Sequence, residues 1–296
     1  MNQGKFALGG IIPPLPTPFN AQGGLDLDAL AKSIEILSPK VDGFLILGSN
    51  GEAAYLSEAE RREVLLRARS AIPKDKIMIA GTGGESSQLV KERNEEVAEI
   101  GADCVLVLAP NYYKGLMSDE LLYQHYALLA EASPLPLYLY NVPANTTIAL
   151  SPSLIARLAK LDNVYGLKDS SGDIFKLTEI MRQVPEDFQL MTGNAPTLLP
   201  ALSLGARGGI LAVGNVAPKI YKAIIEHFQA GEMTEARRLQ LAYNPIALAV
   251  TSLYGVPALK AALRLQGVPA GYPRMPLRDV GGEVLEHLKT LIQNCH

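Results

Sequence analysis

Two polar side chains at the ends of apolar segments offer the clearest chemistry in this sequence. Lys168 closes the apolar segment 164–167, where burial disfavours a charged ammonium and a neutral amine can attack a ketone to form a Schiff base. Tyr140 ends the apolar segment Leu137–Tyr140, where a phenol can carry a proton to or from a bound substrate. The alternatives are that Lys168 extends to solvent or pairs with Asp169, and that Tyr140 is an ordinary core residue.

A short glycine-containing turn supplies a second group of candidates. The segment Gly48-Ser49-Asn50-Gly51-Glu52 combines small hydroxyl and amide side chains with backbone N–H groups, which suits the binding of a carboxylate. An ordinary turn between a strand and a helix is the alternative. Ser170 and Asn194 follow two later apolar segments, and we include them as candidate substrate-binding residues.

The residues that hold metals or phosphate in other protein classes lack the necessary spacing. The 4 histidines form no ligand pattern, alone or with Cys104 and Cys295, so we expect neither a metal nor a disulfide framework. Walker A and Gly-x-Ser-x-Gly motifs are absent from the sequence. The segment Gly81–Ser86 could hold phosphate at a helix N-terminus, but a turn followed by a helix cap is the favoured interpretation.

Apolar segments of strand length recur along the chain, and most are unbroken by polar residues, as in strands buried on both faces. They are Gly10–Ile12, Gly43–Gly48, Ile77–Gly81, Cys104–Ala109, Leu137–Tyr140, Val164–Leu167, Gln189–Gly193 and Gly209–Val213. Amphipathic helical segments separate them, which predicts βαβ units and a parallel sheet. We therefore expect a (β/α)8 TIM barrel with its site at the carboxyl ends of the strands; an open doubly wound sheet is the alternative.

Helix-start signals support this alternation. Ser57 followed by Glu60 forms a capping box and predicts a helix to about Ala71, and Ser151 precedes a first-turn proline. Further helices are predicted at Leu27–Leu37, Ser86–Ile100, Ser118–Ala132, Ser151–Lys160, Asp173–Arg182, Ala195–Leu204, Lys219–Gln229, Met233–Leu253, Pro257–Leu265 and Gly282–Ile292. We expect a barrel over residues 1–230 and a C-terminal helical domain over residues 231–296, packed on the barrel.

The composition excludes several classes of partner. The 296 residues are 48% hydrophobic, which allows a large core and excludes global disorder. A net charge of −3 and an aromatic content of 6% without tryptophan argue against nucleic-acid binding. No uninterrupted apolar segment is long enough for a membrane span, and the N-terminal sequence does not resemble a signal peptide. We expect a cytoplasmic protein with neither nucleic-acid nor membrane partners.

Taken in order, four motifs resemble the dihydrodipicolinate synthase / N-acetylneuraminate lyase family of class I aldolases. They are Pro14-Leu15-Pro16-Thr17-Pro18-Phe19, Gly48-Ser49-Asn50-Gly51-Glu52, Tyr140-Asn141-Val142-Pro143 and Gly166-Leu167-Lys168-Asp169-Ser170-Ser171-Gly172-Asp173. The resemblance covers nearly the whole chain and implies a (β/α)8 barrel with a C-terminal helical domain, in a homotetramer. It implies that Lys168 is the Schiff-base lysine and Tyr140 the general acid/base, with no metal or other cofactor.

The same resemblance implies roles for residues outside these two. Ser49 and Asn50 correspond to the positions that hold the pyruvyl carboxylate, and Ser49 helps to relay protons. Tyr112, or less favourably its neighbour Tyr113, matches the tyrosine of the relay. Ile210 matches a position that lines the pyruvate site.

Two departures from the family pattern point to one branch. Dihydrodipicolinate synthases typically have two threonines where this chain has Ser49-Asn50, and an arginine where it has Asn145. An uncharged Asn145 cannot replace a guanidinium that binds the carboxylate of the aldehyde substrate. These residues resemble the 4-hydroxy-2-oxoglutarate aldolase branch, which cleaves its substrate to pyruvate and glyoxylate, and we expect that reaction.

Several alternatives remain open at this point. Within the enzyme class they are condensation of pyruvate with aspartate semialdehyde, cleavage of a 2-keto-3-deoxy sugar acid, and neuraminate lyase activity. A phosphate-binding barrel isomerase and a noncatalytic, pyruvate-binding regulatory barrel are the others.

Overall fold

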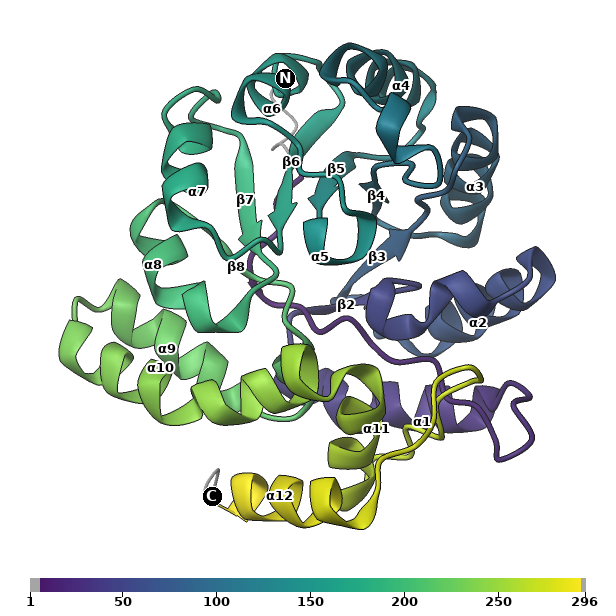
Figure 1. Ribbon diagram of the computed structural model, residues 1–296, viewed down its shortest axis with the longest axis vertical. Helices are drawn as coiled ribbons and strands as arrows, with labels where there is room; N and C mark the ends of the chain where they lie inside the picture. Colours follow the sequence, from purple (N-terminus) through teal and green to yellow (C-terminus); the bar gives the residue numbers. More distant parts are fainter. Residues whose placement is uncertain (1–5, 294–296) are drawn as a thin grey trace. The chain divides into compact units, whose positions relative to one another are not determined.

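The computed structural model describes residues 6–293 and has eight strands in one sheet that alternate with helices along the chain (Figure 1). The strands are β1 (Gly10–Ile11), β2 (Gly43–Ile46), β3 (Ile77–Gly81), β4 (Cys104–Leu108), β5 (Leu137–Asn141), β6 (Val164–Asp169), β7 (Gln189–Thr192) and β8 (Gly208–Gly209). Their order in the sheet is β1-β8-β7-β6-β5-β4-β3-β2, so neighbours in sequence are neighbours in space. Together with the alternation of strands and helices, this order confirms the predicted (β/α)8 TIM barrel.

The first and last strands are the shortest. β8 was expected over Gly209–Val213 but consists of Gly208–Gly209, and residues Ala212–Asn215 form a 3-10 turn instead. Gly208 has φ of 152°, and a Cβ there would lie 2.0 Å from the carbonyl oxygen of Gly10. This close approach of two backbones requires glycine, and it is a contact between distant residues that apolar patterning does not reveal.

The chain divides into two compact units, and the first comprises Met1–Gly10 and Ile79–Gly209. It contains β4 to β8 and the helices α3 (Ser87–Ile100), α4 (Asp119–Ala132), α5 (Pro143–Thr146), α6 (Pro152–Leu158), α7 (Ile174–Met181) and α8 (Leu198–Ser203). Within this unit, the helices α3, α4, α6, α7 and α8 lie outside the row of parallel strands (Figure 1). The side chains of β4, β5 and β6 are almost all buried, as expected for strands covered on both faces.

The second unit comprises Ile11–Met78 and Ile210–His296. It contains β2 and the helices α1 (Leu27–Leu37), α2 (Glu58–Ala71), α9 (Pro218–Gln229), α10 (Met233–Leu248), α11 (Gly255–Leu265) and α12 (Gly282–Gln293). The segment after β1 adjoins β2, because Pro14 bridges Leu45 in parallel and the N–H of Asp42 donates to the carbonyl of Ile11 at 3.0 Å. β1 and β3 each pass from one unit into the other.

Helix boundaries follow the sequence signals closely. α1 has the predicted bounds, and the capping box between Ser57 and Glu60 forms at the start of α2 with both reciprocal hydrogen bonds. Ser151 caps α6, as its position before a proline predicts. The predicted helix Met233–Leu253 is α10 followed by a π-helical turn over Ala249–Leu253. The short helix α5 was not predicted.

Within residues 6–293, none of the helices is long and apolar enough to cross a membrane. Cys104 is buried and free, whereas Cys295 and His296 lie outside the described residues. The predicted domain boundary at residue 230 stays a prediction.

A buried histidine makes the stability of the fold depend on pH. His125 on α4 is buried, and its Nδ1 lies 2.8 Å from Ser87 Oγ on α3. Burial lowers the pKa of His125 to about 4, so the folded state holds a neutral imidazole where the unfolded chain binds a proton. The unfolded state therefore binds more protons between pH 4 and 6.5, and stability is lost as the pH falls through this window.

We expect the free energy of unfolding to decrease by about 2–3 kcal/mol between pH 7 and pH 4.5 because of His125. The variant His125→Gln lacks this contribution, so its decrease is smaller by that amount in urea unfolding at the two pH values. His287→Gln is the matched control, because His287 is exposed. Equal pH dependence in wild type and His125→Gln would contradict the expectation.

Candidate active site

Tyr140 and Lys168 are the penultimate residues of two adjacent strands, β5 and β6, and lie at the same level. β5 and β6 are parallel, and their register pairs Tyr140 with Lys168. Lys168 Nζ lies 4.1 Å from the centroid of the Tyr140 ring. Only 4% of Lys168 and 6% of Tyr140 are exposed, so the alternative in which Lys168 extends to solvent is wrong.

The second alternative for Lys168, a salt bridge to Asp169, is also wrong. Asp169 Oδ2 accepts from Asn141 Nδ2 at 2.6 Å, and Oδ1 accepts from the N–H and the hydroxyl of Ser171 at 2.9 and 2.5 Å. The buried carboxylate is therefore satisfied by neutral donors. Because the bond between Asn141 and Asp169 joins the last residues of β5 and β6, it fixes the strand ends that carry Tyr140 and Lys168.

The surroundings of Lys168 suit a nucleophilic amine. Two lysines are buried among residues 6–293, and the other one, Lys260, forms a salt bridge of 2.5 Å with Glu52. Lys168 Nζ has neither a hydrogen bond nor a salt bridge to any residue in this range. A buried charged ammonium without a counter-ion is unfavourable, and the neutral amine is the form that attacks a carbonyl carbon.

A glycine provides the room for the Lys168 side chain. A Cβ on Gly193 would lie 2.9 Å from Lys168 Cε and 1.9 Å from Ser170 Oγ. Gly166, two residues before Lys168 on the same strand, does not provide this room, because a Cβ there would meet the carbonyl oxygen of Gln189 at 2.1 Å. Gly193 ends the predicted segment Gln189–Gly193. Its contacts with Lys168 and Ser170 could not be predicted, because apolar patterning does not show which distant side chains meet.

Ser170 lies beside Gly193, as Lys168 does, and Asn194 is the next residue after Gly193. The N–H of Ser170 donates to the carbonyl of Asn141 at 2.9 Å, and both Ser170 and Lys168 contact Gly193. Asn194 follows β7, and its Nδ2 lies 2.8 Å from the position of a Cβ on Gly172. Both side chains are half-buried. They lie in the loops after β6 and β7, where polar side chains can contact a substrate.

Tyr112 is not buried with Lys168. It is 76% exposed, and its ring packs edge-on against Tyr113 at 5.0 Å. A residue that the sequence did not single out holds its backbone: Glu85 Oε2 accepts from the N–H groups of Asn111 and Tyr112 at 2.9 and 2.8 Å. Two donors on one carboxylate oxygen fix the direction of this loop.

Ser49, Asn50 and Ile210 lie in the second unit. Ser49–Gly51 is a 3-10 turn after β2, in which the N–H of Gly51 donates to Gly48 and that of Glu52 to Ser49. The N–H groups of Ser49 and Asn50 have no acceptor among residues 6–293, and their side chains are half-buried. A turn with two unused donors suits a carboxylate. Ile210 is buried directly after β8.

No group of three or more His, Cys, Asp or Glu side chains within residues 6–293 could hold a metal ion. Gly81 ends β3, residues 82–86 form the loop that follows it, and Ser86 caps α3 by accepting from the N–H of Leu89 at 3.2 Å. This is the role that the sequence favours for the segment.

Comparisons with known proteins agree with one another. Residues 7–295 match the dihydrodipicolinate synthetase family. The 4-hydroxy-tetrahydrodipicolinate synthase of Archaeoglobus fulgidus is 34% identical over 287 residues, which cover 96% of this chain and 97% of that protein. The dihydrodipicolinate synthase DapA-2 of Bacillus anthracis superposes with a TM-score of 0.93 at 29% identity, covering 98% and 99% of the two chains. A prophage protein of the dihydrodipicolinic acid synthase family from E. coli K12, solved with pyruvate, gives 0.92 at 30% identity, covering 98% and 99%.

The contact between Gly193 and Lys168 predicts the effect of one added methyl group. Gly193→Ala should displace the Lys168 side chain and lower the rate of borohydride-trapped adduct formation with a 2-oxo acid about 10²-fold. The control is Gly9→Ala, because a Cβ on Gly9 would make an ordinary contact of 3.5 Å. A folded Gly193→Ala variant that traps as fast as wild type would show that Gly193 does not position Lys168.

Proposed function

The chain belongs to the dihydrodipicolinate synthetase family, whose members are pyruvate-dependent class I aldolases, and we propose that Lys168 is the residue with which it forms a Schiff base. The observation that carries the proposal is the buried Lys168 amine, which has no counter-ion among residues 6–293 and lies 4.1 Å from the Tyr140 ring. The metal-free reaction of the family fits this arrangement, because a protonated imine is itself the electron sink.

The proposed reaction begins with attack of the neutral Lys168 amine on C2 of pyruvate. Water leaves, an iminium ion forms, and loss of a proton from C3 gives an enamine. The enamine carbon then attacks an aldehyde, the new carbon–carbon bond forms, and Tyr140 donates its phenolic proton to the developing alkoxide. Hydrolysis or displacement of the imine releases Lys168. Cleavage of a 4-hydroxy-2-oxo acid follows the same steps in reverse, with Tyr140 as the base.

We assign the remaining roles to the other candidates. Ser49 and Asn50 bind the carboxylate of the 2-oxo acid, which is supported by the two unused N–H groups of their turn. Ser49 and Tyr112 relay protons to and from Tyr140, with Tyr113 as the alternative to Tyr112. Ser170 and Asn194 contact the substrate from the loops after β6 and β7, and Ile210 lines the pyruvate site.

The names of the relatives favour one aldehyde substrate. The relatives from Archaeoglobus fulgidus and Bacillus anthracis are called 4-hydroxy-tetrahydrodipicolinate or dihydrodipicolinate synthase. These names support condensation of pyruvate with aspartate semialdehyde, which the sequence had ranked second. They lend no specific support to the 4-hydroxy-2-oxoglutarate reaction that it had ranked first. Condensation with aspartate semialdehyde is therefore the first candidate.

One observation keeps 4-hydroxy-2-oxoglutarate as the second candidate. Asn145 lies exposed on α5, directly after the segment that carries Tyr140, at the position where an arginine was expected for a dihydrodipicolinate synthase. An amide lacks the charge and the paired donors with which arginine binds a carboxylate. This substitution favours an aldehyde without a distant carboxylate, such as glyoxylate.

We further propose that the protein acts as a homotetramer in the cytoplasm. The tetramer rests on the family resemblance. Small molecules are the proposed partners, which the net charge of −3 and the low aromatic content support against nucleic acid.

The Schiff base can be trapped and located. Incubation with pyruvate and borohydride should place a stable adduct on the peptide that contains Lys168, as read by mass spectrometry. Lys168→Ala should abolish both the adduct and turnover, whereas Lys160→Ala should preserve both, because Lys160 is exposed. Tyr140→Phe should keep the adduct and lower kcat about 10²–10⁴-fold. An adduct on a different lysine, or none, would refute the assignment.

The aldehyde substrate can be identified by kinetics on wild type and one variant. A higher kcat/KM with aspartate semialdehyde supports the first candidate, and a higher value for 4-hydroxy-2-oxoglutarate cleavage supports the second. Asn145→Arg should raise kcat/KM for aspartate semialdehyde about 10-fold or more, because it adds a charged hydrogen bond to the carboxylate. Its value for glyoxylate addition to pyruvate is the internal control. Equal changes with both aldehydes would contradict a role for residue 145 in specificity.

A further inference from the structure

Glu52 is a buried charge next to the proposed carboxylate-binding turn. It directly follows Ser49-Asn50-Gly51, and its N–H donates to the carbonyl of Ser49 at 3.1 Å to close the turn. Its backbone adopts the left-handed conformation, with φ 52° and ψ 33°. This conformation is unfavourable for a residue other than glycine and persists where the surroundings hold it. The contacts of the Glu52 side chain are therefore relevant to the shape of the turn.

Residues from the C-terminal part of the chain contact both oxygens of the Glu52 carboxylate, one through a salt bridge and the other through a hydrogen bond. Lys260 Nζ on α11 lies 2.5 Å from Glu52 Oε1, and the two side chains are 0% and 1% exposed. The N–H of Arg274 donates to Glu52 Oε2 at 2.8 Å. Lys260 Nζ also donates to the carbonyl of Tyr272 at 2.7 Å and lies 4.5 Å from the ring centroid of Phe19. The pair is thus fully enclosed by protein groups, and each charge lies against its counter-ion.

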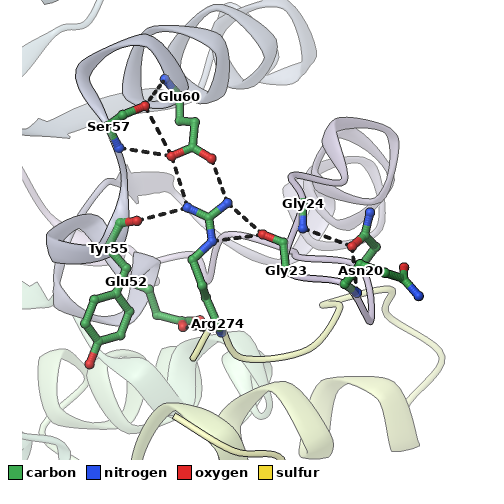
Figure 2. A network of polar contacts seen from close by, with 9 residues as sticks. Asn20, Gly23, Gly24, Glu52, Tyr55, Ser57, Glu60 and Arg274 are labelled. Atoms are coloured by element: carbon green, nitrogen blue, oxygen red, sulfur yellow. Dashed lines mark hydrogen bonds and ion pairs between the residues drawn. The ribbon is translucent and has the colours of Figure 1, made fainter. Parts of the chain in front are cut away.

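The Arg274 side chain binds residues that lie before and after Glu52 in the sequence (Figure 2). Its guanidinium donates to both oxygens of Glu60 at 2.6 and 3.0 Å, to the carbonyl of Gly23 at 2.7 and 2.9 Å, and to that of Tyr55 at 2.9 Å. The hydrogen bonds that Glu60 accepts from Arg274, together with those from Ser57, lower its pKa to about 2. Arg274, whose N–H binds Glu52, therefore also binds Tyr55 and Glu60 on the C-terminal side of the turn.

Lys260 has no access to a substrate of its own. Its side chain is fully buried, and its ammonium already contacts Glu52, Tyr272 and the Phe19 ring. A Schiff base at Lys260 would require the salt bridge to break and the core of the second unit to open. Any effect of Lys260 on the reaction must therefore pass through the residues that it contacts.

We propose that Glu52 and Lys260 are positioning residues for the 2-oxo acid, because their salt bridge fixes the conformation of the Ser49–Asn50 turn that binds its carboxylate. This inference rests on the assignment of Ser49 and Asn50 under the proposed function. Without Lys260, a charged Glu52 would be buried and unpaired, so its side chain would turn toward water and release the turn. α11 thus contributes to substrate affinity although it lies about two hundred residues from the turn in sequence.

The test separates substrate affinity from the later steps. Borohydride trapping on Lys168 is measured against pyruvate concentration, and KM for pyruvate and kcat are determined separately. In Lys260→Met, half-saturation and KM should rise about 10-fold or more, while kcat at saturating pyruvate stays within about 3-fold of wild type. Glu52→Gln should change KM in the same direction. Lys222→Met is the matched control, because Lys222 pairs with Asp42 at 2.8 Å elsewhere in the second unit and should leave KM unchanged.

Loss of a buried partner can also prevent folding, so the double variant Glu52→Gln/Lys260→Met is included. It leaves no buried charge unpaired, and its folding is checked by cooperative thermal unfolding. Its KM for pyruvate should exceed that of wild type and lie below that of either single variant that folds. A wild-type KM in any folded variant of Glu52 or Lys260, or a decrease in kcat without a change in KM, would overturn the proposal. Absence of an adduct on Lys168 in wild type would instead refute the proposed function.

Discussion

Lys168 is buried at the end of β6 without a counter-ion among residues 6–293, and the proposed chemistry depends on this arrangement. Proteins normally pair a buried charge, and the structure does so for Lys260, the other buried lysine among residues 6–293. The negative charge nearest to Lys168 in sequence, Asp169, bonds instead to Asn141 and Ser171. The strand end therefore offers an amine that no salt bridge holds, and an amine attacks a carbonyl carbon in its neutral form.

Two kinds of interaction hold this amine and its surroundings in place. Hydrogen bonds at the ends of β5 and β6 join Asn141 to Asp169, and the absence of a side chain on Gly193 leaves space for the Lys168 stem. In the second unit, the Ser49–Asn50 turn is closed by Glu52, whose charge is balanced by Lys260 on α11. In each case a residue that takes no part in the proposed reaction holds the position of one that does. Such supporting contacts give a site on loops a defined geometry.

The sequence predicts what depends on local or periodic patterns. The bounds of α1, the capping box of α2 and the positions of Lys168 and Tyr140 at strand ends follow from caps and apolar periodicity. Contacts between distant residues were not predicted, because no local pattern encodes them. Gly193 beside Lys168 and Glu85 beneath Tyr112 are examples, as is the early end of β8 against Gly10. The argument for one aldehyde substrate over another depends on a single position, Asn145. Similarity over the whole chain identifies the family but does not distinguish between these substrates.

The proposed function depends on Lys168 as the amine that reacts with the 2-oxo acid. The most direct test is a crystal structure of the wild-type protein at saturating pyruvate. We expect continuous electron density between Lys168 Nζ and C2 of the bound molecule, with the salt bridge between Lys260 and Glu52 intact. Pyruvate bound without a covalent link to Lys168, or linked to another lysine, would contradict it.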